Sequence, residues 1–310
     1  VCKHEFTASI SGVGTAKYFD NIDNAFTAAL SAENNGCTLT LYKDCELSQN
    51  IVIGNATVTV DMNGHSILLA YRIKVNDGGV LYLKNSGENG SIETEIDVNK
   101  GGTLINGTAD DSRSAVSVFG VTADAAKRVE IYGGSYEGLT VNNGTSGIAL
   151  YGGSYESINT NDLTDSTPVS ALLAKGYAFA TLNSVTHLPE SIVDGSAVTL
   201  SEGIRNVTVV EHEHRYNVET GKCPCGVCAL AIFTETTQSS ETYTFIESAT
   251  QFKNIAENEA DGVLKLTGDV DCIVKGIIIN GNKTIDMNGH TLNVSVGTEE
   301  ISAVAVYGNV

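Results

Sequence analysis

The chain has 310 residues, of which 42% are hydrophobic, so it can bury sizeable cores, and its length corresponds to about two domains. It contains 32 Gly, 3 Pro and no Trp, and its many Val, Ile and Thr residues favour short strands joined by tight turns. The formal net charge of −19, without a cluster of Lys and Arg, argues against a nucleic-acid partner, and no apolar stretch is long enough for membrane insertion.

The first predicted element is a short amphipathic helix near residues 20–34. Apolar side chains recur there with the spacing of one helical face, at Ile22, Ala25, Phe26, Ala29 and Leu30. Asn35-Gly36 follows and provides a stop signal. We therefore expect one helix to precede the strands of the chain.

A pentapeptide follows the helix and occurs twice. Asp61-Met62-Asn63-Gly64-His65 recurs as Asp286-Met287-Asn288-Gly289-His290, about 225 residues later. A repeat of this length predicts two copies of one module. The Asn-Gly pair predicts a tight turn, rather than a catalytic role for His65 and His290.

Shorter repeats indicate a solenoid between the two copies. Val75–Leu81 is echoed by Val98–Leu104, 23 residues later, and Ile131–Glu137 is echoed by Leu150–Glu156, 19 residues later. Steps of this size, with Gly or Asn at the corners, suit coils that stack on one another, because the corners need left-handed backbone conformations. The predicted fold class is all-β, with residues 1–210 forming one complete module.

The second copy begins with its own helix, predicted near residues 248–259. Ser248 and Gln251 have the spacing of a capping box, ahead of the apolar residue Phe252. The second module, residues 241–310, contains only the start of a coil, so we expect the sequence to be part of a longer protein. In each module the helix should cover the apolar end of the first coil and prevent edge pairing.

The order of these elements resembles the start of the right-handed parallel β-helix of pectate-lyase-like proteins, in which a helix precedes strands and a turn such as Val60–His65. More narrowly, Ala171–Phe179, Val207–Val210 and Gly221–Gly226 resemble segments of large repetitive surface proteins of gut Gram-positive bacteria. The resemblance implies a right-handed parallel β-helix with an N-terminal capping helix, in a protein that is secreted or displayed at the bacterial cell surface. It implies no particular activity, because one fold hosts many functions.

A cluster of His and Cys lies in the linker predicted between the modules, residues 211–240. Its members are His212, His214, Cys223, Cys225 and Cys228. His-x-His places both imidazoles on one side of an extended segment, and two His with two Cys complete a tetrahedral structural zinc site. We predict that both His, Cys223 and one of the other two Cys bind zinc. A disulfide, most simply between Cys225 and Cys228, is the alternative in an oxidising compartment.

Tyrosine and glutamate side chains on successive coils are the candidate ligand-binding residues. They are Tyr132, Tyr136, Tyr151, Tyr155, Glu137 and Glu156. Equivalent positions on stacked coils would place the four rings in one ladder beside the carboxylates, and aromatic faces with nearby acceptors suit neutral sugars. The alternative is that the rings pack on one another and shield the sheet, next to a solvated row of acids.

No set of catalytic residues is recognisable in the sequence. Pieces that resemble a polygalacturonase signature occur in the wrong order, and only Glu137 and Glu156, about 4.8 Å apart on neighbouring coils, offer a carboxylate pair. We therefore expect a β-helix surface protein that acts in adhesion, with an extracellular glycan or a host or bacterial surface protein as partner. The alternatives are a polysaccharide lyase or glycoside hydrolase, and a purely structural spacer.

Overall fold

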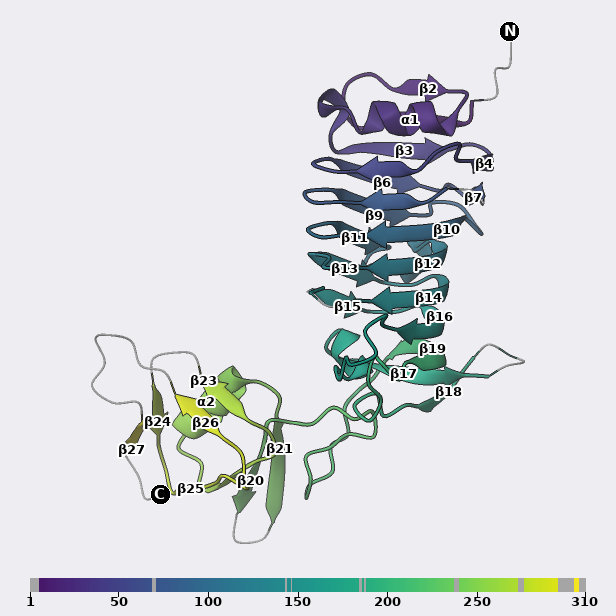
Figure 1. Ribbon diagram of the computed structural model, residues 1–310. Helices are drawn as coiled ribbons and strands as arrows, with labels where there is room; N and C mark the ends of the chain where they lie inside the picture. Colours follow the sequence, from purple (N-terminus) through teal and green to yellow (C-terminus); the bar gives the residue numbers. More distant parts are fainter. Residues whose placement is uncertain are drawn as a thin grey trace. The chain divides into compact units, whose positions relative to one another are not determined.

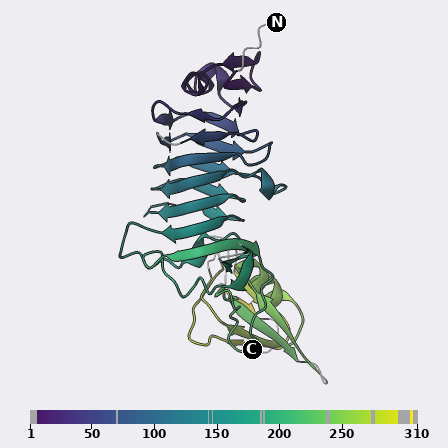
Figure 2. The ribbon, with the colours of Figure 1, turned by 90° about the vertical axis from the view of Figure 1, so that its right-hand side faces the viewer.

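The computed structural model describes residues 6–68, 71–142, 144–145, 147–183, 186, 188–236, 240–272, 276–294 and 304–306. The chain divides into two compact units, Val1–Glu213 and His214–Val310, and in each the described strands far outnumber the helices. The first unit is a parallel β-helix, in which successive coils of the chain stack on one another (Figure 1, Figure 2). No helix within the described ranges is long and apolar enough to cross a membrane.

One sheet of the β-helix begins with an antiparallel hairpin and continues as a parallel stack. In spatial order its strands are β2 (Lys17–Phe19), β1 (Ala8–Ser11), β3 (Cys37–Leu41), β6 (Thr57–Asp61), β9 (Val80–Lys84), β11 (Thr103–Asn106), β13 (Arg128–Ile131) and β15 (Ile148–Leu150). Ala8 pairs antiparallel with Leu41, whereas Leu39 pairs in parallel with Val60 on the next coil. The sequence did not predict the β1–β2 hairpin. The expectation that a helix precedes the strands and blocks the edge of the first coil was therefore wrong, because two strands come before the helix and β1 itself pairs with the edge of β3.

A second sheet completes the coils. In spatial order its strands are β4 (Cys45–Glu46), β7 (Ser66–Leu68), β10 (Ser91–Val98), β12 (Ser117–Ala123), β14 (Ser135–Val141), β16 (Ser154–Asn159), β19 (Ile204–Glu211), β17 (Tyr177–Leu182) and β18 (Pro189–Ile192), with β8 (Ile73–Val75) and β5 (Ile51–Ile53) joined to β10. The strand β19 pairs antiparallel with both β16 and β17. This reversal ends the parallel stack.

The core of the β-helix consists of aliphatic columns that run along the stack. Strand alternation turns every second side chain inward, and pairing between successive coils places equivalent positions on top of each other. Leu39, Val60 and Leu83 form such a column on β3, β6 and β9, and each is at most 1% exposed. The column continues with Asn106 on β11 and Ile131 on β13. The buried side-chain amide of Asn106 therefore interrupts a row of aliphatic side chains.

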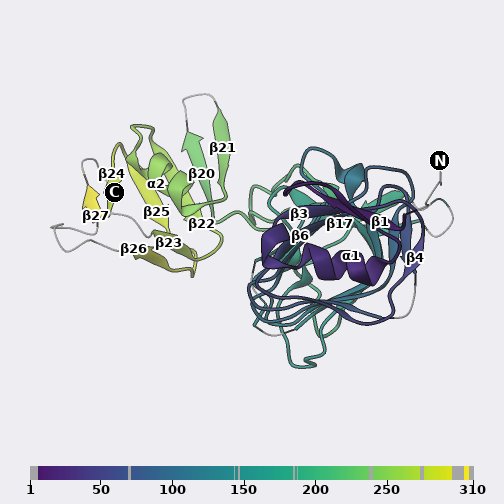
Figure 3. The same ribbon diagram turned by 90° about the horizontal axis from the view of Figure 1, so that it is seen from above.

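Helix α1 (Ile22–Ala29) lies across the N-terminal end of the stack (Figure 3). The side chain of Asn21 caps it by accepting a hydrogen bond from a backbone N–H of the first turn at 3.1 Å. Its apolar face, which includes Ile22 and Phe26, is buried in the same core as the first coil. The remaining short helices of the first unit are η1 (Ala32–Asn34), η2 (Ser112–Ser114) and η3 (Val169–Leu172).

The second unit repeats the beginning of the first. Its elements are β20 (Ala231–Thr236), β21 (Glu241–Ile246), α2 (Ala249–Glu257), β22 (Gly262–Leu266), β23 (Val270–Cys272), β24 (Ile277–Ile279), β25 (Lys283–Asp286), β26 (Leu292–Val294) and β27 (Val304–Val306). The strand β20 pairs antiparallel with β21 and β22, as β1 does with β2 and β3. The sequence duplication is therefore a duplication of structure. Because β20 falls within the linker predicted at 211–240, the sheet of the second unit begins earlier than residue 241.

Helix α2 begins with the predicted capping box. Ser248 Oγ accepts a hydrogen bond from Gln251 N at 3.2 Å. The side chain of Gln251 in turn accepts from Glu247 N at 2.8 Å, one residue before the cap. Phe252 is fully buried, so the apolar face of this helix also packs against the core of its own unit.

The repeated pentapeptide forms the same turn in both units. Asn63 and Gly64 adopt φ angles of 47° and 80°, and the equivalent Asn288 and Gly289 adopt 44° and 81°. Two consecutive positive φ angles define a type I′ turn, which Asn-Gly adopts readily. The Asn63 side chain also donates to the Leu41 carbonyl of the preceding coil at 2.9 Å. The motif is therefore a structural corner, as predicted.

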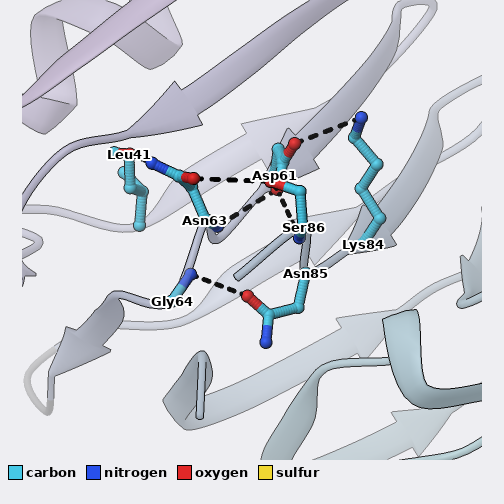
Figure 4. Close-up of polar contacts among 7 residues, drawn as sticks. All are labelled: Leu41, Asp61, Asn63, Gly64, Lys84, Asn85 and Ser86. Atoms are coloured by element: carbon cyan, nitrogen blue, oxygen red, sulfur yellow. Dashed lines mark hydrogen bonds and ion pairs between the residues drawn. The ribbon is translucent and has the colours of Figure 1, made fainter. Parts of the chain in front are cut away.

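Asp61 is the centre of the hydrogen-bond network at this corner (Figure 4). Its Oδ1 accepts from Asn63 N at 3.0 Å and from both the backbone N and the hydroxyl of Ser86, at 3.0 and 2.9 Å. Its Oδ2 forms an ion pair with Lys84 at 3.1 Å. Burial by itself raises the pKa of Asp61, but these hydrogen bonds outweigh it and hold the pKa below its ordinary value.

Candidate functional site

The candidate metal-binding residues lie in a tightly folded loop that follows β19. The backbone N–H of His212 donates to the carbonyl that precedes β17 at 2.8 Å. Further along, Gly226 N donates to Cys223 O at 2.8 Å, which closes a β-turn with Pro224 in its second position. Proline presets the backbone angle that this position requires. The turn brings Cys223 and Cys225 close together.

Four of the predicted ligands meet in this loop. One donor atom from each of His212, His214, Cys223 and Cys225 lies within 4.8 Å of the other three. Cys225 Sγ and His214 Nδ1 are 3.3 Å apart, and both cysteines are buried. Donors on a tetrahedral zinc ion are about 3.3 to 3.8 Å apart, because Zn–N and Zn–S bonds measure about 2.0 and 2.3 Å. The set of two nitrogens and two sulfurs therefore fits a metal ion.

Cys228 lies outside this group. Its side chain is exposed, and its Sγ contacts the Gly226 carbonyl at 3.8 Å. From the sequence, the fourth ligand could be either Cys225 or Cys228. In the structure it is Cys225 that lies in the cluster. Both thiols are free, so the alternative disulfide between them is not formed in this structure.

The surroundings of the cluster favour a neutral thiol until a cation is present. Burial raises the pKa of Cys225 to about 11, and the neighbouring Cys223 acts in the same direction. A metal ion binds the thiolate and would stabilise it there. Beside the cluster, Tyr216 packs against His214 with ring centroids 5.5 Å apart and donates to the Glu247 carboxylate at 2.9 Å. This contact fixes the loop to the residue that follows β21.

The repeated segment Tyr-Gly-Gly-Ser-Tyr-Glu separates the four predicted tyrosines into two stacks. Tyr132 and Tyr151 are half-buried, and their ring centroids are 4.4 Å apart at an interplanar angle of 7°. Tyr136 and Tyr155 are buried inside the coil, with centroids 5.0 Å apart and an angle of 12°. The rings do not form the single ladder predicted from the sequence, because strand alternation after the glycine turn directs the second tyrosine of each repeat inward.

Glycine is required at this turn. A Cβ at Gly152 would lie 2.3 Å from the Tyr132 carbonyl oxygen, and Gly153 has a φ of 97°. The Tyr155 hydroxyl donates to the Gly152 carbonyl at 2.9 Å, which satisfies both polar groups inside the core. The tyrosines and glycines of the repeat therefore build the coil, whereas the glutamate that ends each repeat is exposed.

A groove of about 700 Å³ follows the exposed face of β10, β12, β14 and β16. Three consecutive strand positions line it on each coil. The first position is Ser91, Ser117, Ser135 and Ser154, and the third position is Glu93, Phe119, Glu137 and Glu156. The second position is apolar or tyrosine and buried beneath them. Because Phe119 is 41% exposed, an apolar surface lies among the carboxylates.

The groove contains some of the predicted ligand-binding residues and excludes others. Glu137 and Glu156 line it, with the two buried tyrosines beneath, whereas Tyr132 and Tyr151 are not among its lining residues. Leu182 and Asn183 of the β17–β18 hairpin and Asn206 of β19 also line it. Sequence reasoning missed Glu93, Phe119 and the serine row. The signal that could have identified them is a three-residue pattern that recurs on each coil. It consists of a serine, then a buried residue, then an exposed residue.

Comparison with protein-family models, with curated proteins and with solved structures found no match for this chain. The β-helix itself is evident from the parallel pairing of its coils. A functional interpretation therefore depends on the side chains of the loop and of the groove.

Proposed function

We propose that the first unit binds a glycan along the groove and that the protein acts in adhesion. The observation that supports this best is the combination of hydroxyl, carboxylate and aromatic side chains along β10, β12, β14 and β16. Sugars offer hydroxyl groups to such donors and acceptors, and an apolar ring face to an exposed aromatic side chain such as Phe119. A groove that extends over several coils suits an extended chain of sugars.

The proposed setting is outside a bacterial cell, on a protein that is secreted or displayed at the surface. This part of the proposal rests on the resemblance of the chain to pectate-lyase-like β-helices and to repetitive surface proteins of gut Gram-positive bacteria. The duplicated module agrees with such a repetitive protein. The formal net charge of −19 keeps such a protein soluble and opposes non-specific contact with anionic surfaces.

A glycan array tests the binding proposal. The intact chain should bind a subset of extended glycans, and Phe119→Ala should weaken that binding at least tenfold. Tyr82→Ala is the matched control, because Tyr82 is a similarly exposed aromatic residue, 37% accessible, on β9 of the other sheet. Binding that Phe119→Ala leaves unchanged would contradict the assignment of the groove. Absence of binding to any glycan would favour the structural spacer.

One observation favours a second function, glycoside hydrolysis. Glu137 and Glu156 lie on directly paired strands and line the same groove. Neighbouring strands are about 4.8 Å apart, close to the carboxyl separation of about 5 to 5.5 Å in retaining glycosidases. Incubation of a bound glycan with the chain, followed by measurement of new reducing ends, decides between the two. If the glycan is hydrolysed, and Glu137→Gln or Glu156→Gln abolishes the hydrolysis, the protein is an enzyme. If the glycan stays intact, the groove only binds it.

We also propose that the loop after β19 holds a structural zinc ion through His212, His214, Cys223 and Cys225. Thiolate and imidazole donors in a compact set are typical of zinc, which prefers four tetrahedral ligands. Because protein side chains would fill all four positions, the ion would leave no open position for a substrate. Its role would be to fix the loop, since the metal-binding free energy becomes folding free energy.

Metal analysis of protein purified without chelator tests the zinc proposal. About one zinc per chain is expected. Cys225→Ser should abolish zinc binding, whereas Cys228→Ser, the matched control just outside the cluster, should retain it. Chelation should release the loop, so that Cys223 and Cys225 leave their buried position and become accessible to a thiol reagent. Protein that contains no zinc and instead has a disulfide between Cys225 and Cys228 would refute this assignment.

A further inference from the structure

The carboxylates of the groove have no basic partners. Within the described part of the chain, the side chains of Glu93, Glu137 and Glu156 form no ion pair or hydrogen bond. Some acids elsewhere on the β-helix are paired: Asp61 with Lys84, Asp97 with Arg72, and Glu130 with Arg128. In the groove, by contrast, three carboxylates share one face and no described base pairs with them.

Stacking these acids opposes the stability of the sheet. Tyr136 pairs with Tyr155 in register, so the following residues, Glu137 and Glu156, stand on neighbouring strands about 4.8 Å apart. Like charges at such positions repel, and the formal net charge of −19 adds to the negative potential of the groove. A positively charged ligand would remove this repulsion on binding.

Two paired glycines lie next to Phe119 and Glu137 in the sheet. Gly120 pairs with Gly138, and these glycines directly follow Phe119 and Glu137 in the chain. A Cβ on either glycine would be in ordinary contact, 3.5 Å from its nearest neighbour, and neither φ is positive, so neither space nor the backbone requires glycine here. Glycine inside a strand often marks a place where another molecule approaches closely.

We propose that the ligand of the groove is an oligosaccharide of amino sugars with free ammonium groups. This inference rests on the proposed function and specifies its ligand. Glu93, Glu137 and Glu156 would pair with ammonium groups, and Phe119 would contact a ring face or an ammonium group. The serine hydroxyls would bind the sugar hydroxyls. A glycan suits the face of a paired sheet better than a peptide does, because it has no row of amide groups that need a strand edge.

Calorimetric titration of the intact chain with two matched ligands tests this inference. One ligand is a β-linked glucosamine hexasaccharide, and the other is its fully N-acetylated, neutral counterpart. The glucosamine ligand should bind at least tenfold tighter, and its affinity should fall with added salt, because exposed charges are screened. The double substitution Glu137→Gln with Glu156→Gln should reduce its affinity about tenfold. The matched control is Glu46→Gln with Glu88→Gln, which changes the net charge equally outside the groove.

Each outcome of the titration leads to a different conclusion. Equal binding of both hexasaccharides, or a preference for the neutral one, would overturn the inference and leave glycan binding intact. Binding of neither ligand by a chain that binds other glycans on the array would also overturn it. An oligolysine peptide that binds as tightly as the glucosamine ligand, with the same loss in the double variant, would assign the groove to a basic peptide instead. No binding in any of these assays would refute the proposed function itself.

Discussion

Replacing Asn106 by leucine should destabilise the β-helix, although it makes the core more apolar. Asn106 is 1% exposed and lies in the column between Leu83 and Ile131. Its Nδ2 donates to the Val116 carbonyl at 2.7 Å and to the Tyr136 hydroxyl at 2.6 Å, and its Oδ1 accepts from Val116 N at 2.8 Å. Leucine would leave both backbone groups of Val116 without these partners inside the core.

The expected cost of the substitution follows from these contacts. Each buried backbone group that loses its partner costs about 1 to 3 kcal/mol, and burial of leucine offsets about 2 kcal/mol of the sum. Asn106→Leu should therefore lower the free energy of unfolding by about 2 kcal/mol. Tyr155→Phe is a useful comparison, because it leaves a single buried backbone group, the Gly152 carbonyl, without its partner and should cost about 1 to 3 kcal/mol.

Urea unfolding followed by circular dichroism measures both variants. An Asn106→Leu variant as stable as the unsubstituted chain would refute the reasoning, because it would mean that Val116 finds other partners at no cost.

Three further predictions concern the corner, the glycine turn and the second helix. Because the folded-state pKa of Asp61 lies below its unfolded value of about 3.9, its stabilisation is complete above about pH 5 and is lost as the pH falls through the folded value. The difference in unfolding free energy between Asp61→Ala and the unsubstituted chain should therefore shrink toward pH 2, and a difference independent of pH would contradict this. Gly152→Ala should cost about 2 kcal/mol or more in thermal unfolding, whereas Gly138→Ala should cost nothing, because its Cβ has room. Ser248→Ala should destabilise α2 by about 1 kcal/mol, and amide hydrogen exchange in that helix measures the loss.

The turn of the repeated pentapeptide could be predicted because its causes are local. Asn63 and Gly64 adopt positive φ angles in consecutive positions, and that preference belongs to the dipeptide itself. The partners of Asp61 could not be predicted in the same way. Lys84 and Ser86 come from the next coil, and no local pattern shows which residues of two coils will face each other.

The metal cluster shows the same limit at a smaller scale. Two His and three Cys in one short segment predicted a four-ligand site from residue chemistry alone. The choice between Cys225 and Cys228 depends on the turn closed by Gly226 N and Cys223 O, which places one thiol inward and leaves the other exposed. Spacing alone cannot distinguish the two, because both positions are close enough in the chain to reach the same ion.

The sequence identified residues of the groove only where the coils repeat almost unchanged. Ser135-Tyr136-Glu137 and Ser154-Tyr155-Glu156 are similar enough to align by eye, whereas Ser117-Val118-Phe119 shares only its serine and its alternation. The loops between coils differ in length, so equal spacing does not identify equivalent positions. Phe119 became recognisable only through the pairing of Val118 with Tyr136.

The residues of a β-helix that recur most closely from coil to coil need not be the residues that bind a ligand. The glycine pairs of the tyrosine repeat recur because a Cβ at Gly133 or Gly152 would collide with a backbone oxygen, so stability explains them fully. The third position of each groove strand has no such constraint, since it faces solvent. Stability would favour mixed charges or neutral polar residues there, yet Glu93, Glu137 and Glu156 repel one another and Phe119 exposes an aromatic ring. The fold gains no stability from these exposed carboxylates and this exposed aromatic ring. Binding of a ligand therefore explains their presence in the groove better than stability does.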